Sequence, residues 1–326
     1  MKSNFLSTLA AAAALVCTPA GAQSPAAWQP DKHVEFVVGS APGGGNDRTA
    51  RVLQKVWQEN KLLQNVSVLN KVGGGGSLAY THVHQHPNDA HYLAVVRPGF
   101  LSNHILGRSP IGLNDMTPLA MLSGERAVIA VRAASPLKSV ADIVERLKQD
   151  PQSLAFTVGS ARGSTPHLMM ALLAKQNGID ARRLKVVTFA GGAESVAQVL
   201  GGHLDLMAIA IDNAAPHHKN GAMRILGMST AQRAPGLPDV PTLRDLGFDI
   251  ILSGFTVIMG PRGLTPAQIA YWENMLERGV QHADWKRQLA ADYQDGDFKK
   301  SAATREHLRQ QYDFLRSMYA DIGMTK

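Results

Sequence analysis

The sequence predicts an α/β protein with mixed, mainly parallel sheets. Short apolar runs alternate with amphipathic segments along most of the chain, and several of these runs end in a glycine turn that opens the next helix. Glycine provides 30 of the 326 residues, whereas aromatic residues make up 6%. This composition is typical of a protein with many tight connections between strands and helices.

Nine apolar runs are expected to be strands: Val34–Val38, Val66–Leu69, Leu93–Val96, Val128–Val131, Leu154–Val158, Val186–Phe189, Leu204–Ile211, Arg224–Met228 and Phe255–Met259. The helical patterns between them are Arg48–Glu59, Leu78–Gln85, Val140–Lys148, Thr165–Lys175 and Ala193–Leu200. Strands that alternate with helices of roughly 10–15 residues form βαβ units, so parallel pairing is expected. After Phe255 the pattern changes to three successive helices, of which the last is expected to pack as a closing brace: Thr265–Gly279, Trp285–Ala291 and Ala302–Tyr319.

Residues 1–22 are expected to be a secretory signal peptide. Lys2 precedes an apolar, alanine-rich stretch at residues 5–16, and Ala20-Gly21-Ala22 forms a small-x-small cleavage site. The apolar stretch is too short to span a membrane. The mature chain would therefore begin at Gln23 and lie in a bacterial periplasm.

Composition disfavours several classes of protein. Cys17 is the only cysteine, so the mature chain would contain no disulfide and no cysteine nucleophile. The bulky Val16 disfavours a lipoprotein anchor at Cys17. The 33 lysines and arginines exceed the 26 acidic residues, but they are scattered, and no nucleic-acid site is expected. A net charge of +7 suits an anionic small molecule, although it equally suits a purely solubilising charge.

The first candidate binding turn lies between the first apolar run and the first helix. Three consecutive glycines let the backbone approach a ligand, and the helix start offers unpaired N–H groups with a partial positive charge. A carboxylate or phosphate fits such a turn, although a plain capped turn is the alternative. No lysine follows the glycines and the spacing G-x-G-x-x-G is absent, so a nucleotide motif is excluded. The candidate ligand-binding residues, the last of which would either cap the helix or bind the ligand, are Gly43, Gly44, Gly45, Asn46 and Asp47.

A second turn with the same order of strand, glycine loop and helix spans residues 159–167. Arg162 suits a carboxylate because a guanidinium can form two parallel hydrogen bonds with it, but a solvated loop arginine is the alternative. Ligands of open α/β sheets bind beyond the carboxyl ends of the strands, so the two turns are expected to face one another across a cleft. The candidate residues of this turn are Ser160, Ala161, Arg162, Gly163, Ser164, Thr165 and His167.

Further candidates follow other strands. A glycine turn after the run 186–189 contributes Ala190, Gly191 and Gly192, and Asp212 follows the run 204–211. Another glycine run, Gly73–Gly76, is interpreted slightly more readily as a flexible connection than as a set of backbone donors.

No catalytic, metal or cofactor site is expected. The sequence lacks the motifs G-x-S-x-G and H-E-x-x-H, and glycine turns without a nucleophile and base only bind. His82 and His86 share one helix face. No cysteine or carboxylate stands at a zinc-binding spacing from them, so a solvated helix end is favoured.

The order of these motifs resembles the solute receptors of tripartite tricarboxylate transporters, also called Bug receptors, through almost the whole mature chain. The most specific match is the segment Leu237–Thr242, which reads LPDVPT, with Gly247 beyond it. The other matching segments are Pro42–Asp47 with Ala50-Arg51, Asn70–Gly76, Gly163-Ser164 with His167-Leu168, Phe189–Ala193 and Gly201–Asp205.

The resemblance implies a two-domain periplasmic-binding-protein (flytrap) fold with the ligand in the cleft. Domain 1 would comprise residues 23–128 and 254–326, and domain 2 residues 129–253. The resemblance also implies that backbone amides at the first two glycine turns bind a small carboxylate. The chain departs from the family at Arg162, where small or uncharged residues are usual, and Arg97 ends another strand; two extra cations would suit a ligand with a second or third acidic group.

The expected function is therefore a monomeric periplasmic receptor without enzymatic activity. It would capture a di- or tricarboxylate or an aromatic carboxylate and deliver it to a membrane permease of a tripartite tricarboxylate transporter. One alternative is a receptor that docks on a membrane sensor kinase. A secreted hydrolase is less favoured because the mature chain would have no cysteine and the sequence has no G-x-S-x-G motif.

Overall fold

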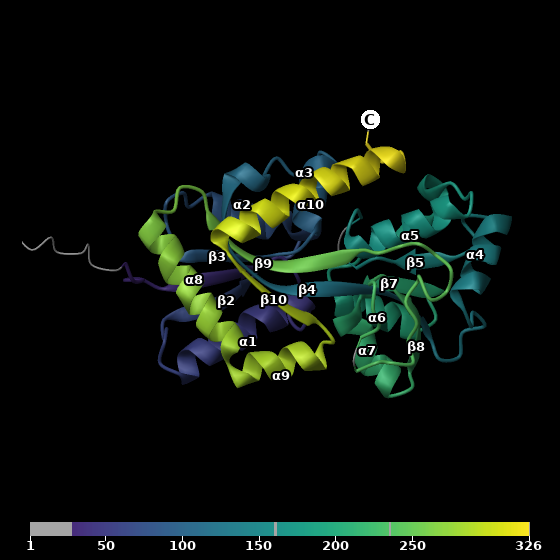
Figure 1. The fold of residues 1–326 in the computed structure, drawn as a ribbon, viewed down its shortest axis with the longest axis horizontal. Coiled ribbons are helices and arrows are strands. Elements are labelled where there is room, and N and C mark those ends of the chain that lie inside the picture. The colour runs from purple at the N-terminus through teal and green to yellow at the C-terminus, as the bar shows by residue number, and fades with distance from the viewer. Residues whose placement is uncertain (1–27, 160–161, 235, 326) are drawn as a thin grey trace, which may run out of the picture.

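The structure, a computed structural model, describes residues 28–159, 162–234 and 236–325. Ten strands form one mixed sheet in the order β2-β1-β3-β9-β4-β7-β5-β6, with β10 and β8 also paired to β4. Figure 1 shows the sheet running through the middle of an elongated molecule, with helices on both of its faces. The expected signal peptide, residues 1–22, lies outside the described residues.

The first half of the sheet is built from βα units. β1 (Val34–Val38) pairs in parallel with β2 (Val66–Asn70) and with β3 (Tyr92–Val96). A helix follows each of these strands, and a short 3-10 turn at 74–76 precedes the second helix: α1 (Gly45–Glu59), α2 (Ser77–His84) and α3 (Gly99–Ile105).

The core of the first half packs α1 against β1. Trp57 on α1 stacks on Phe36 of β1 with ring centroids 5.8 Å apart. Trp272 joins the same cluster, and its indole N–H donates to the carbonyl of Ala90. Trp272 lies on the first of two helices that cover this core, α8 (Pro266–Gln281) and α9 (Ala283–Ala291).

One long strand, β4 (Met116–Arg132), belongs to both halves of the sheet. Residues 116–126 pair antiparallel with β9 (Ser253–Pro261), and β10 (Asp295–Lys300) pairs with the same part of β4 on its other side. Residues 127–132 pair instead with the two strands β7 (Leu206–Ala210) and β8 (Met223–Met228).

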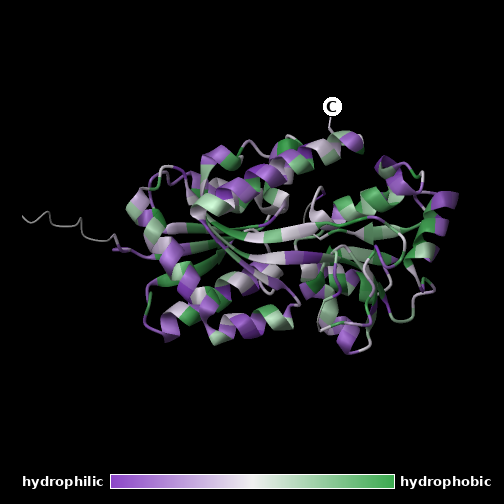
Figure 2. Cartoon of the chain, in the orientation of Figure 1, coloured by the Kyte–Doolittle hydropathy of each residue, from purple (hydrophilic) through white to green (hydrophobic). Residues whose placement is uncertain are grey.

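The second half repeats the βα arrangement. β5 (Ala155–Thr157) lies between β6 (Lys185–Val187) and β7 and is parallel to both. Short 3-10 turns lie at 113–115, before β4, and at 181–183. The helices of this half are α4 (Val140–Gln149), α5 (Thr165–Gln176), α6 (Gly192–Leu200) and α7 (Ile211–Lys219). Figure 2 shows hydrophobic residues along the central strands and hydrophilic residues mostly on the outer sides of the helices.

The last helix, α10 (Ser301–Asp321), runs along the molecule from the first half toward the second, as Figure 1 shows. Tyr319, near its end, donates a hydrogen bond to the carbonyl of Gly163, which precedes α5. Lys175 on α5 forms an ion pair with Asp321. Leu315 and Tyr319 belong to the same apolar cluster as Leu168 of α5 and Phe255 of β9. The helix therefore braces both halves, as expected.

The predicted α/β fold is confirmed, but several elements differ from the prediction. The expected strand 128–131 is the end of the much longer β4, and β10 was not predicted because its six residues, DGDFKK, are mostly polar. The helix α3 was also not predicted. α1 begins at Gly45 rather than Arg48, so the glycine turn is shorter than expected. The domain boundaries near 128 and 254 remain predictions. Among the described residues, no helix combines the length and apolarity that a membrane crossing requires.

Candidate functional site

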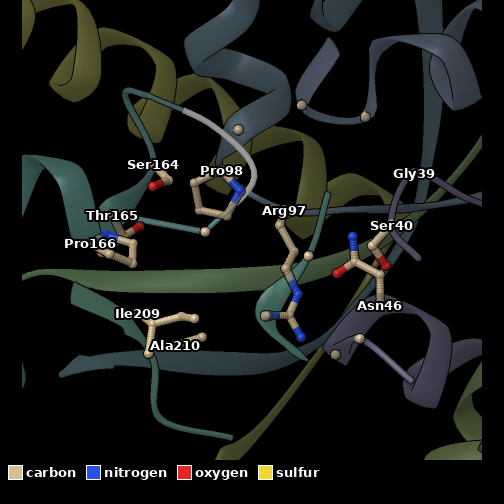
Figure 3. Close-up of a pocket in the computed structure, with 18 of the residues that line it drawn as sticks. Gly39, Ser40, Asn46, Arg97, Pro98, Ser164, Thr165, Pro166, Ile209 and Ala210 are labelled. Atoms are coloured by element: carbon tan, nitrogen blue, oxygen red, sulfur yellow. The ribbon is translucent and has the colours of Figure 1, made fainter. Parts of the chain in front are cut away.

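A cavity of about 110 Å³ lies between the two halves of the sheet. Figure 3 shows Arg97 in its centre, with Ser40 and Asn46 on one side and Thr165, Ile209 and Ala210 on the other. The first half contributes Gly39, Ser40, Gly44, Gly45, Asn46, Gly75, Gly76, Tyr80, Arg97, Pro98, Gly99 and Glu125 to its lining. The second half contributes Val158, Gly159, Ser164, Thr165, Pro166, Gly191, Gly192, Ile209, Ala210 and Asn213.

Six helices begin at this cavity: α1, α2, α3, α5, α6 and α7. Within the described parts of the chain, none of their N-termini carries a side-chain cap. Of the helices that start elsewhere, Ser139 caps α4 and Thr265 caps α8, whereas the last helix, α10, has no side-chain cap. Uncapped N-termini expose N–H groups and a partial positive charge, so their convergence makes the cavity suited to an anion.

Asp47 holds the first glycine turn from within. Its buried carboxylate accepts hydrogen bonds from the backbone N–H of Gly43, the guanidinium of Arg51 and the amide of Asn70. Although burial opposes ionisation, these hydrogen bonds keep the pKa of Asp47 below its ordinary value. Asp47 and Gly43 do not line the cavity, so Asp47 positions the turn rather than pointing into the cavity.

Gly45, the first residue of α1, approaches the second half very closely. A Cβ atom there would lie 2.4 Å from Oδ2 of Asp212 and 2.7 Å from Nη2 of Arg97. Both distances are shorter than real Cβ atoms show. Only glycine lets the start of α1 meet these two side chains.

Arg97 is the cation of the cavity wall. Its Nη1 donates to Oε1 of Glu125 at 2.8 Å, and its Nη2 lies 3.8 Å from Oδ2 of Asp212. Among the described residues, Nε and Nη2 of Arg97 have no hydrogen-bond partner, and neither does the buried Oγ of Ser40. A buried polar atom without a partner raises the free energy of the ligand-free protein. A ligand that forms hydrogen bonds with these atoms removes that cost.

Two acidic side chains adjoin Arg97 in a network that links the halves. Asp212, at the start of α7, accepts a hydrogen bond from Nη2 of Arg48 at 2.6 Å, and Arg48 also lies 3.5 Å from Asp292. Glu125 is buried beside them. Burial raises the pKa of Glu125 to about 7, against the opposing effect of Arg97 and with the support of Asp212.

Several predicted residues lie outside this cavity. Arg162 and Ala190 line a second, open hollow, together with Arg108. Nη2 of Arg162 donates to the carbonyl of Val186 at 2.6 Å. Gly163 lies behind the wall, where its carbonyl accepts a hydrogen bond from the hydroxyl of Ser102. Ser160 and Ala161 lie outside the described residues.

His167 supports the second turn from inside. Its Nδ1 accepts the N–H of Gly163 at 2.9 Å. Burial, together with the positive charges of Arg162 and Arg108, lowers the pKa of His167 to about 4. The ring is therefore a neutral acceptor that holds the loop before α5. The predicted residues that do line the cavity are Gly44, Gly45, Asn46, Ser164, Thr165, Gly191, Gly192 and Arg97.

Comparison with known proteins decides the family. The sequence pattern of the tripartite tricarboxylate transporter family receptor (TctC) matches residues 49–311. The chain belongs to this family. Proteins of the family are periplasmic solute-binding receptors.

Relatives and solved structures agree with this assignment. The chain is similar to a protein encoded in the gbd 5' region of Cupriavidus necator, with 29% identity over 86% of this chain and 84% of that one. The structure of the periplasmic binding protein BugD matches with a TM-score of 0.83 at 20% identity, over 91% of this chain and 100% of that one. The structure of MatC from Rhodopseudomonas palustris with bound malate matches with a TM-score of 0.81 at 22% identity, over 89% of this chain and 99% of that one.

Sequence reasoning missed several residues of the receptor's cavity, including Glu125, Tyr80 and Asn213. Glu125 gave a weak signal, since it lies with Ser123 and Arg126 in a short polar interruption between two apolar runs. Tyr80 left none, because an aromatic residue on an amphipathic helix is usually part of the core. The run Gly73–Gly76, interpreted as a flexible connection, does contribute to the cavity through Gly75 and Gly76. Among the described residues, no group of three or more metal-binding side chains occurs.

Proposed function

We propose that this receptor captures a small organic carboxylate in the cavity between its halves. One observation carries this proposal: six helix N-termini without side-chain caps converge on the cavity. A carboxylate supplies the negative charge and the acceptor atoms that such N-termini lack. Arg97 adds a guanidinium whose free donors face the same space.

The ligand holds the halves together in this proposal. α1 begins on the first half and α5 on the second, so one carboxylate that accepts from both N-termini connects them. Ligand binding then selects the closed conformation because only that conformation offers both sets of donors. The closed receptor delivers its ligand to the permease of a tripartite tricarboxylate transporter. The bound malate of MatC, a protein of the same fold, supports the choice of a small carboxylate.

A thermal-shift screen of mono-, di- and tricarboxylates tests the proposal. A ligand at a hundredfold excess over its dissociation constant stabilises the folded protein by about 2.7 kcal/mol, which is a readable shift. Failure of every carboxylate to stabilise the receptor would refute the proposal.

The variant Arg97→Lys tests whether the ligand binds in this cavity. Lysine keeps the charge but loses the planar donors, so we expect the affinity to fall by about tenfold or more. Arg233→Lys is the matched control, since Arg233 pairs with Asp245 on the surface. Equal affinities of Arg97→Lys and wild type would place the ligand elsewhere.

A further inference from the structure

We propose that Glu125 selects ligands that carry a hydrogen-bond donor, an amino or hydroxyl group, beside the carboxylate. This inference rests on the proposed capture of a carboxylate and names the class of carboxylate. Glu125 would accept a hydrogen bond from the ligand's amino or hydroxyl group, while Arg97 and the helix N-termini bind the ligand's carboxylate.

The hydrogen bonding of Glu125 is incomplete. Arg97 donates to its Oε1, but no residue in the described part of the chain donates to Oε2. The buried Asp47, by comparison, accepts three hydrogen bonds. Oε2 occupies space beside the backbone of Gly254, where a Cβ atom would lie 2.9 Å from it, so glycine at position 254 makes room for this carboxylate. Glu125 lines the cavity with its side chain 8% exposed, so a ligand there can supply the hydrogen-bond donor that Oε2 lacks.

The charges around the cavity also favour a ligand that carries a donor group. Glu125, Asp212 and Asp292 face two guanidinium groups, those of Arg97 and Arg48. The fully ionised cluster therefore has one negative charge in excess. A ligand that brings only negative charge next to Glu125 adds to this excess. An ammonium group offsets it, and a hydroxyl group donates a hydrogen bond to Glu125 without adding charge.

The contact between Glu125 and the ligand should also depend on the protonation state of Glu125. Its carboxyl, with a pKa of about 7, faces Arg97 and Asp212, while Arg48 and Asp292 lie beyond Asp212. Tyr80, the remaining titratable group of the lining, stays neutral because burial raises its pKa. Above neutral pH an ionised Glu125 accepts from the ligand's donor. Below it, a protonated Glu125 becomes a donor and tolerates a plain carboxylate.

Calorimetric titrations with matched ligands test the inference. The probes share a carbon skeleton: succinate, malate and aspartate, and likewise glutarate, 2-hydroxyglutarate and glutamate. At pH 8, where Glu125 is ionised, we expect a donor-bearing probe to bind at least about tenfold more tightly than its plain counterpart. The stronger of the amino and hydroxy probes identifies the donor.

The variant Glu125→Gln removes the charge and keeps the shape. We expect it to reduce the preference for the donor-bearing probe to within about threefold. A preference that survives in Glu125→Gln, or a wild type that binds succinate and glutarate as tightly as the others, overturns the inference. Binding of plain carboxylates alone overturns it while leaving the proposed function intact, whereas no binding of any carboxylate refutes the proposed function itself.

The wild-type protein provides a readout that needs no variant. On lowering the pH from 8 to 6, Glu125 gains a proton, so affinity for the plain dicarboxylates should rise several-fold and affinity for the amino-acid probes should fall. Parallel pH profiles for all probes would contradict a direct contact with Glu125.

Discussion

At the scale of single residues, the site depends on the close approach of the α1 backbone to two charged side chains. Gly45 is the point where α1, Arg97 and Asp212 meet, and its lack of a side chain is what brings the charge network to the start of the helix. The sequence identified this glycine as part of a binding turn. It could not show the reason, because both contacts come from residues distant in the chain, at positions 97 and 212.

The variant Gly45→Ala should lose both stability and ligand affinity. The new methyl group has to displace Asp212 or Arg97, which costs about 1–3 kcal/mol. Gly124→Ala is a matched control, since a Cβ there meets no atom within 4 Å. Urea denaturation of both variants measures the difference, and equal stability of the two would show that the contact is relaxed without cost.

Arg162 was the residue expected from the sequence to make the ligand unusual, but its position argues for a smaller role. Its guanidinium bonds the carbonyl of Val186 and faces the neighbouring hollow. We therefore expect Arg162→Ala to change the affinity for the ligand by less than about twofold, the scale of an exposed charge. A loss comparable to that of Arg97→Lys would extend the binding site into this hollow.

At the scale of elements, the apolar strands and most helices were predictable, since their periodicity and glycine turns are local signals. The first part of β4 was not, because residues such as Ser123, Glu125 and Arg126 interrupt its apolar pattern. These polar groups are tolerated only because partners from distant segments pair with them, as Gln294 does with Ser123. The site residue Glu125 was missed for the same reason.

The loop before α5 should depend on pH through His167. The folded state lowers the pKa of this buried histidine to about 4, so the unfolded chain binds its proton first. The contribution of His167 to the free energy of unfolding is therefore full above the ordinary histidine pKa, and about 3 kcal/mol of it is lost as the pH falls from about 6.5 toward 4. His167→Asn keeps an acceptor for the N–H of Gly163 and should lose less stability than wild type between pH 7 and 4.5. Urea denaturation at both pH values measures this, and identical losses would assign the effect to other groups.

At the scale of the whole molecule, the halves meet through charge as well as through the sheet. Arg48 on α1 reaches Asp212 at the start of α7, across the cavity region. The Asp212 side chain of this ion pair is fully buried and that of Arg48 is 28% exposed. The resemblance to a flytrap fold was predictable from sequence motifs, whereas this link was not, because its partners are 164 residues apart.

The variant Arg48→Gln should shift the ligand-free receptor toward an open conformation. Small-angle X-ray scattering would then show a larger radius of gyration without ligand and a return to the wild-type value with it. Arg51→Gln is the control on the same helix, because Arg51 pairs with Asp47 inside the first half. An unchanged radius in Arg48→Gln would mean that the strands alone set the conformation.

β4 connects the two halves of the molecule as one continuous strand. Its 17 residues pass from one half to the other as a single strand, with partners along both parts. Because partners hold it along both parts, we expect this strand to bend through small dihedral changes spread over many residues rather than at a hinge of a few residues. Its amides should therefore resist hydrogen exchange during every opening, and the glycine turns around the cavity should exchange in its place.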